Sequence, residues 1–197
     1  MAHYFDSTNT KSYSGTYSVI FQKRCFDFNT DHGVFSKQHL DEGSKLLIEG
    51  FIKTNPENLN CLDLGCGIGV IGIVCNTLSP SLKFDYVDVN ERAVKLTTKN
   101  LEKNNLKGNV YLSDCLDSVL DKTYDIVISN PPIRAGNAVF YNMFNQSYEV
   151  LNKGGKLIVV LRFKQGAKTY IKKISELFGN SNILEKDKGF VVCEFTK

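Results

Sequence analysis

The abrupt end of one apolar run constrains this chain more than any other feature of its sequence. Residues 125–129 are rich in β-branched side chains and are followed at once by Asn130, Pro131 and Pro132. The run predicts a buried parallel strand, and the prolines exclude a helix and fix the backbone as it leaves the strand. Chemistry in an open α/β sheet lies at the carboxyl ends of its strands. The Asn130 amide oxygen and the Pro131 carbonyl are both acceptors, so together they could hold the two hydrogens of an amino group. A strand breaker without chemistry is the alternative.

A short strand, a glycine-rich turn and a helix are predicted over residues 61–72. Glycines permit a tight turn and let backbone N–H groups approach a ligand closely. Asp63, just before the first glycine, is an acceptor for a cationic or hydrogen-bond-donating ligand. The spacing of Gly67, Gly69 and Gly72 also fits the dinucleotide-binding pattern, so this motif alone leaves the class of ligand open.

Two further carboxylates come at the ends of predicted strands. Asp88 ends the strand 83–88, where a carboxylate can accept from both hydroxyls of a ribose. Capping the helix that begins near Glu91 is the alternative role for Asp88. Asp114 follows the strand 109–112 and could accept from an adenine amino group or serve as a turn residue.

Strands and helices alternate along most of the chain. We expect strands over 60–64, 83–88, 109–112, 124–129 and 156–162, and helices over 70–78, 91–104, 137–150 and 167–178. This alternation indicates a parallel sheet with helices on both faces. Segments 182–185 and 190–195 are joined by about four residues, which is too few for a parallel crossover and predicts an antiparallel hairpin. The expected fold is therefore an α/β three-layer sandwich with a seven-stranded, mostly parallel sheet and an antiparallel C-terminal strand.

The N-terminal part has a different pattern. Residues 19–28 alternate and predict a hairpin with its turn near Gln22 and Lys23. A helix from Leu40 to Phe51 follows. We expect residues 1–52 to form an N-terminal extension that packs on the domain formed by residues 53–197.

Composition bears on where the protein works and on whether it binds a metal. No apolar run approaches the ~18 residues of a membrane span, and no charged-then-apolar leader is evident, so we expect a cytoplasmic protein without membrane contact. Six cysteines lie mostly in apolar strands, as reduced thiols would. They form no Cys-x-x-Cys pair, so we expect no metal site.

The net charge of +3 neither demands nor excludes nucleic acid, but its placement is informative. Basic side chains gather after the strand 156–162, at Arg162, Lys164, Lys168, Lys172 and Lys173, and Arg134 lies beside the same edge. A basic rim around a site suits a phosphate backbone. For Lys172 and Lys173 we prefer a solvated helix face.

The order of these motifs resembles that of the class I S-adenosylmethionine-dependent methyltransferases. The matching residues are Asp63-Leu64-Gly65-Cys66-Gly67, Asp88-Val89-Asn90, Asp114 and Asn130-Pro131-Pro132. The Asn-Pro-Pro motif is similar to that of enzymes that methylate an exocyclic amine or an amide nitrogen. Within those, the chain looks most like the small-domain group that contains the guanine-N2 methyltransferases of small-subunit (16S) ribosomal RNA. Residues 33–36 and 151–155 also resemble that group.

The resemblance implies S-adenosyl-L-methionine as cofactor and ribosomal RNA, naked or in a small-subunit particle, as partner. It places the cofactor against Asp63, Gly65, Cys66, Gly67, Gly69, Asp88, Val89, Asp114, Cys115 and Asn130. It assigns catalysis to Asn130, Pro131 and Pro132. Together with the basic rim, it gives the expected substrate-binding residues as Phe35, Ile133, Arg134, Arg162 and Lys164. The chain departs from the group at Ile133, where many relatives carry an aromatic that stacks on the target base.

The mechanism expected from these residues needs no strong base and no metal. Asn130 and the Pro131 carbonyl would orient a guanine amine, whose lone pair is delocalised into the ring, toward the methyl group. Three alternatives stay open: the same chemistry on adenine in RNA or DNA or on a protein glutamine amide, a nicotinamide oxidoreductase, and a non-catalytic RNA-binding or ribosome-assembly module. We expect a monomer or a homodimer.

Overall fold

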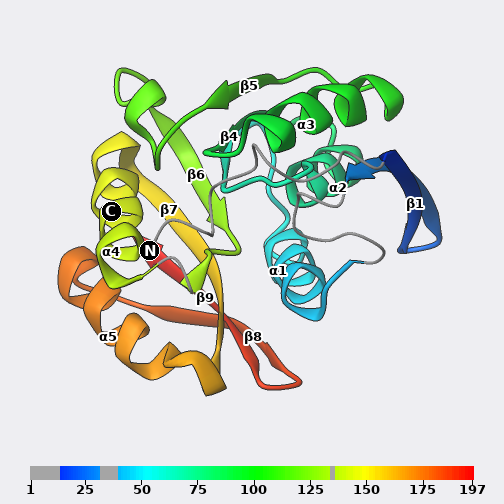
Figure 1. Ribbon diagram of the computed structural model, residues 1–197. Coiled ribbons are helices and arrows are strands. Elements are labelled where there is room, and N and C mark those ends of the chain that lie inside the picture. Colours follow the sequence, from blue (N-terminus) through cyan, green and yellow to red (C-terminus); the bar gives the residue numbers. More distant parts are fainter. Residues whose placement is uncertain (1–13, 32–39, 134–135) are drawn as a thin grey trace.

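The structure, a computed structural model, describes residues 14–31, 40–133 and 136–197. A seven-stranded sheet with the order β5-β4-β3-β6-β7-β9-β8 runs through the molecule (Figure 1). Its strands are β3 (Asn60–Leu64), β4 (Lys83–Asp88), β5 (Asn109–Leu112), β6 (Tyr124–Ser129), β7 (Leu151–Arg162), β8 (Asn182–Asp187) and β9 (Phe190–Thr196). The first five pair in parallel, and β9 lies antiparallel between β7 and β8. This arrangement confirms the predicted fold class.

Helices cover both faces of the sheet (Figure 1). One face carries α1 (Glu42–Ile52), α2 (Val70–Leu78) and α3 (Glu91–Lys103), and the other carries α4 (Asn137–Val150) and α5 (Ala167–Phe178). Successive side chains of a strand point to opposite faces, so Ile158 and Val160 enter the first core and Leu157 and Val159 enter the second. Burial on both sides explains why the central strands are continuous apolar runs.

Several predicted boundaries differ from the structure. The first helix begins at Glu42 and not at Leu40, because the Asp41 carboxylate caps it by accepting from the Ser44 N–H at 3.0 Å. Helix α3 ends at Lys103, one residue earlier than predicted. The C-terminal hairpin has longer strands and a tight turn at Lys188 and Gly189, which both have positive φ.

Strand β7 begins at Leu151, five residues before the predicted start. The turn-like pair Gly154 and Gly155 suggested a loop, but both residues bond to the backbone of Lys197 at 2.9 Å. Gly154 has a φ of 79°, and a Cβ on Gly155 would lie 2.8 Å from the Asn152 carbonyl oxygen. The glycines therefore let the strand run through a distorted start instead of interrupting it.

The predicted N-terminal hairpin is confirmed as β1 (Ser14–Phe21) and β2 (Arg24–Asp31). Gln22 and Lys23 form its turn with φ of 47° and 63°, which is the twist that a two-residue hairpin loop needs. The inner face of the hairpin, including Phe26 and Phe28, belongs to the same core as α1, α2 and α3. The boundary between residues 52 and 53 stays a prediction.

Five of the six cysteines are buried, but Cys25 is exposed. The prediction of a packed thiol is wrong there because β1 and β2 form a separate two-stranded sheet, and the residues that the structure describes leave one of its faces open. Cys25 pairs with Ile20, which is 78% exposed, on the open face. Within the described residues, no group of three or more His, Cys, Asp or Glu side chains is placed to hold a metal ion. None of the described helices is long and apolar enough to cross a membrane.

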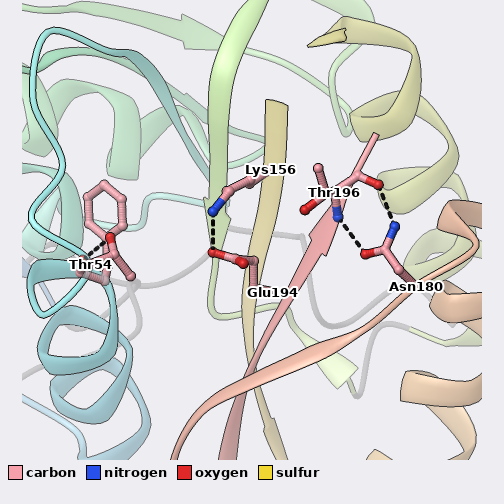
Figure 2. A network of polar contacts seen from close by, with 6 residues as sticks. Thr54, Lys156, Asn180, Glu194 and Thr196 are labelled. Carbon is pink, nitrogen blue, oxygen red and sulfur yellow. Dashed lines mark hydrogen bonds and ion pairs between the residues drawn. The ribbon is translucent and has the colours of Figure 1, made fainter. Parts of the chain in front are cut away.

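Polar contacts hold β9 at the amino end of β7 (Figure 2). Lys156 on β7 donates to the buried Glu194 on β9 at 3.0 Å. The Asn180 side chain donates to the Thr196 carbonyl at 2.7 Å and accepts from the Thr196 N–H at 2.9 Å. Asn180 thus replaces a strand neighbour for the last residue of β9.

Candidate active site

Strand ends bring the predicted site residues to one edge of the sheet. Leu64 at the end of β3 pairs with Val87 on β4, and Asp63 pairs with Ile128 on β6. The segments that follow β3, β4 and β6 therefore leave the sheet side by side. One carries the glycines, one follows Asp88, and one begins with Asn130.

The glycine loop has the conformation of a ligand cradle. Gly65, Gly67 and Gly69 have φ of 71°, 58° and 84°. Residues other than glycine adopt such backbone angles only with steric strain. A Cβ added at Gly65 or Gly67 would have no atom of the described residues within 4 Å, so among these residues the backbone borders open space there. The N–H groups of Gly65 and Cys66 both donate to the Val87 carbonyl, at 2.9 and 3.0 Å.

Helix α3 holds this loop from behind through two side chains that the sequence did not single out. Thr97 Oγ1 donates to the Gly67 carbonyl at 2.8 Å, and Asn100 Nδ2 donates to the Ile68 carbonyl at 2.9 Å. Both side chains are fully buried. Polar residues on the apolar face of an amphipathic helix are the signal that could have revealed them.

Asp88 organises the loop and the start of α3. Its Oδ2 accepts from the Gly67 N–H and its Oδ1 accepts from the Asn90 N–H, both at 2.8 Å. Burial raises the pKa of Asp88, and hydrogen bonds from the backbone of Asn90, Gly67 and Val89 oppose the rise. The cap of α3 is Asn90, whose side chain accepts from the Arg92 N–H at 3.0 Å, so the capping role considered for Asp88 is wrong. A carboxylate can accept about four hydrogen bonds, so Asp88 keeps acceptor capacity for a ligand hydroxyl.

Asp63 lies beneath the loop instead of in open space. It is fully buried, and its Oδ2 accepts from the Gly72 N–H at 2.9 Å. Among the residues that the structure describes, its Oδ1 has no hydrogen-bond partner, and neither has the buried hydroxyl of Tyr86, the residue paired with it on β4. Burial raises the pKa of Asp63 to about 7, with a smaller contribution from Asp88.

The ends of β4 and β5 add an apolar surface beside a carboxylate. Val89 is 39% exposed and Leu112 is 53% exposed. Asp114 is exposed and accepts weakly from the thiol of the buried Cys115 at 3.5 Å. Burial raises the pKa of Cys115 to about 11, so this thiol stays protonated. Apolar faces with one acceptor suit the ring and amino group of an adenine, and Leu112 was not predicted.

The amide of Asn130 is held by the N-terminus of α1. Its Nδ2 donates to Ser44 Oγ at 2.9 Å and to Asp41 Oδ1 at 3.3 Å. The Pro131 carbonyl accepts from the Ile133 N–H at 2.9 Å, so one of its two lone pairs is used. Pro131 is buried, and Ile133 is half-buried. Neither Ser44 nor Asp41 was predicted.

The basic rim lies at the end of β7, next to β6. Arg162 and Lys164 are exposed, and the Arg162 guanidinium lies 5.3 Å from the centre of the Phe190 ring. Phe163 stands between them, 39% exposed, with its N–H bonded to the Gly189 carbonyl at 2.9 Å. The remaining predicted substrate residues, Phe35 and Arg134, fall outside the described residues.

The fold is that of a methyltransferase. It is similar to the T. thermophilus 16S rRNA N2 G1207 methyltransferase (RsmC) in complex with AdoMet and guanosine, with a TM-score of 0.81 and 24% identity, over 95% of this chain and 50% of that one. It is also similar to a ribosomal protein L11 methylase from Lactobacillus delbrueckii subsp. bulgaricus, with a TM-score of 0.66 and 17% identity, over 81% of this chain and 83% of that one.

Sequence comparison is more specific. The methyltransferase small domain family matches residues 25–194, and the chain belongs to this family. It is 37% identical over 197 residues to the uncharacterized protein YbxB of Bacillus subtilis (strain 168), covering 99% of this chain and 98% of that protein. It is 31% identical to ribosomal RNA small subunit methyltransferase C of Aliivibrio salmonicida (strain LFI1238), covering 97% of this chain and 56% of that protein. The family and the fold identify S-adenosylmethionine as the cofactor.

Proposed function

We propose that this protein transfers a methyl group from S-adenosylmethionine to an exocyclic amine of RNA, and that the amine is guanine N2 in small-subunit (16S) ribosomal RNA. The orientation of Asn130 carries the proposal. Its nitrogen is bonded to Ser44 and Asp41, so its oxygen is the end left for a hydrogen-bond donor at the sheet edge.

The residues at the edge fit the cofactor. Its methyl group, bonded to a positively charged sulfur, is the electrophile of the reaction. Asp88 would accept from ribose hydroxyls, and the open backbone at Gly65 and Gly67 would leave room for the rest of the molecule. Asp114 would accept from the adenine amino group, with Val89 and Leu112 against the ring. The other predicted cofactor residues, Cys66, Gly69, Cys115 and Asp63, shape and support this cradle.

The acceptor amine would lie against Asn130. Its two hydrogens would be held by the Asn130 oxygen and by the remaining lone pair of the Pro131 carbonyl. Both acceptors are fixed before the reaction, so they stabilise the positive charge that grows on the amine without reorganising. Pro132 keeps the backbone of this turn extended.

RNA as substrate rests on the relatives and on the basic rim. Ribosomal RNA small subunit methyltransferase C relatives align with nearly the whole of this chain, while the chain spans about half of their length. Arg162, Lys164 and Lys168 would contact phosphates, and Phe163 offers an aromatic face where Ile133 offers none. Such an enzyme would act in the cytoplasm.

Tritiated methyl transfer tests the proposal. The pure protein is incubated with labelled cofactor and, separately, with small-subunit rRNA transcribed in vitro, small-subunit particles, DNA and total protein. Digestion of the labelled RNA to nucleosides should yield N2-methylguanosine. N6-methyladenosine, or label in protein alone, would overturn the guanine assignment, and binding of NADH without binding of S-adenosylmethionine would overturn the chemistry.

A further inference from the structure

We infer that Asp41 and Ser44 are positioning residues that lock the Asn130 amide with its oxygen toward the acceptor, so that the site accepts groups that donate hydrogen bonds. The inference rests on the proposed role of Asn130 and adds the means by which that role is set. It concerns two side chains at the start of α1, far from the motif in sequence: Ser44 and Asn130 are separated by 86 residues.

The chemistry of the Asp41 carboxylate fixes the orientation. The two ends of an amide differ little in size, so packing alone does not distinguish them. An ionised carboxylate only accepts hydrogen bonds, and Asp41 Oδ1 lies 3.3 Å from the amide nitrogen. A flipped amide would place the Asn130 oxygen against that carboxylate oxygen, where two lone pairs repel each other. Ser44 Oγ, at 2.9 Å, accepts from the same nitrogen.

Asp41 and Ser44, which together form a clamp on the Asn130 amide, lie at the start of the rigid helix α1. Asp41 is held because its Oδ1 also caps α1 through the Ser44 N–H at 3.0 Å. The helix is anchored by side chains with no exposed surface, including Leu47, Ile48 and Phe51. A Cβ on Gly43 would lie 3.1 Å from the Phe190 ring, so the start of α1 also packs closely on β9.

The expected consequence is a preference between acceptors. An amino group can donate both hydrogens to the outward oxygen and the Pro131 carbonyl. A carbonyl oxygen of a base has no hydrogen to donate and would meet two acceptors, which is unfavourable. Releasing the clamp should therefore lower turnover by letting the amide turn, while the cofactor cradle on β3 and β4 stays intact.

Substitutions at Asp41 and Ser44 separate positioning from capping. Asn and Ser are both good helix caps, so Asp41→Asn and Asp41→Ser should leave similar thermal stability. Only Asp41→Asn keeps an acceptor oxygen at the reach of the carboxylate. We expect Asp41→Ser combined with Ser44→Ala to lower kcat on in vitro transcribed small-subunit rRNA by about tenfold to a hundredfold. The affinity of this double variant for S-adenosylmethionine should stay within about twofold of wild type. The single variant Asp41→Asn should keep kcat within about threefold of wild type.

A measurement that does not depend on turnover accompanies this one. In 15N spectra of the whole protein, the Asn130 side-chain N–H signals, assigned by their loss in Asn130→Ala, should exchange slowly in the wild type and quickly in the double variant. If the double variant kept slow exchange and full kcat while Asn130→Ala lost turnover, the positioning role of Asp41 and Ser44 would be refuted and the role of Asn130 would stand. Full turnover in Asn130→Ala would overturn both the clamp and the proposed role of Asn130.

Discussion

At the scale of single residues, the buried acid Asp63 makes the stability of the fold depend on pH. An unfolded aspartate has a pKa of about 3.9, and burial raises the pKa of Asp63 to about 7. The folded protein therefore holds a proton on Asp63 that the unfolded chain has already lost. Its contribution to stability is complete below the unfolded pKa and is lost as pH rises through the folded pKa.

Replacing Asp63 with an asparagine should remove this dependence. The new amide would keep an oxygen for the Gly72 N–H and would present a donor where Oδ1 has no partner. The free energy of unfolding of Asp63→Asn, relative to wild type, should rise by about 1.4 kcal/mol per pH unit from about pH 4 to pH 7. Denaturant titrations at several pH values check this. Parallel curves for the two proteins would contradict the prediction.

Asn130 is the residue on which the proposed chemistry depends. Asn130→Ala should lower kcat by about a hundredfold or more, since a fixed acceptor is lost in the transition state. Its melting temperature and its affinity for S-adenosylmethionine should stay near wild type. Asn152→Ala serves as the control, because it removes another side-chain amide, which donates to Asp125 on β6 at 2.9 Å. This variant should keep full turnover. Turnover of Asn130→Ala within a few-fold of wild type would refute the catalytic role.

At the scale of elements, α3 is the support of the glycine loop. Thr97→Val keeps the shape of the side chain but leaves the Gly67 carbonyl without its 2.8 Å hydrogen bond. We expect a loss of about 1–3 kcal/mol of stability and a several-fold weaker affinity for S-adenosylmethionine. Thermal melts and calorimetry measure the two effects. Thr98→Val is the matched control, because the exposed Thr98 hydroxyl bonds only to Val94 of its own helix. Equal effects at both positions would contradict the supporting role.

The elements were largely predictable because their signals are local. The strand 124–129 and the helix 70–78 have their predicted bounds, since apolar periodicity and glycine or proline stops lie within each segment. Side chains that act across the fold were not predictable. Asn100 and Asn29 are 71 residues apart, and no neighbouring pattern marks either of them as one half of a pair. Strand β7 was misjudged at its start because its distorted backbone depends on Lys197.

At the scale of the whole molecule, basic charge lies at both edges of the sheet. A cavity of about 740 Å³ lies at the amino ends of β3 to β6, and Lys83 and Lys107 are among the residues that line it. Arg162 and Lys164 lie at the other end of the strands, where β7 ends. If RNA approaches the carboxyl ends of the strands, only Arg162 and Lys164 contact phosphates. The two pairs carry equal charge, so they separate a local contact from the effect of net charge.

Salt dependence makes this comparison quantitative. Replacing Arg162 and Lys164 with Ala should flatten the slope of log affinity for small-subunit rRNA against log salt by about one to two units, with unchanged S-adenosylmethionine affinity. Replacing Lys83 and Lys107 with Ala should leave the slope near that of wild type. Filter binding at several salt concentrations measures both slopes. The same reduction for both pairs would show that net charge, and not the rim, controls RNA binding.

The position of β9 determines when the seven-stranded sheet can be completed during synthesis. This strand is made after the other strands that the structure describes, yet it lies inside the sheet, between β7 and β8. Until it leaves the ribosome, the long apolar β7 has an open edge, which can pair with other chains. Strand β8 cannot close that edge alone, since it reaches the sheet only through β9. The nascent protein therefore needs its C-terminal hairpin to add as a unit, and a pause in translation before residue 190 would leave β7 exposed to aggregation.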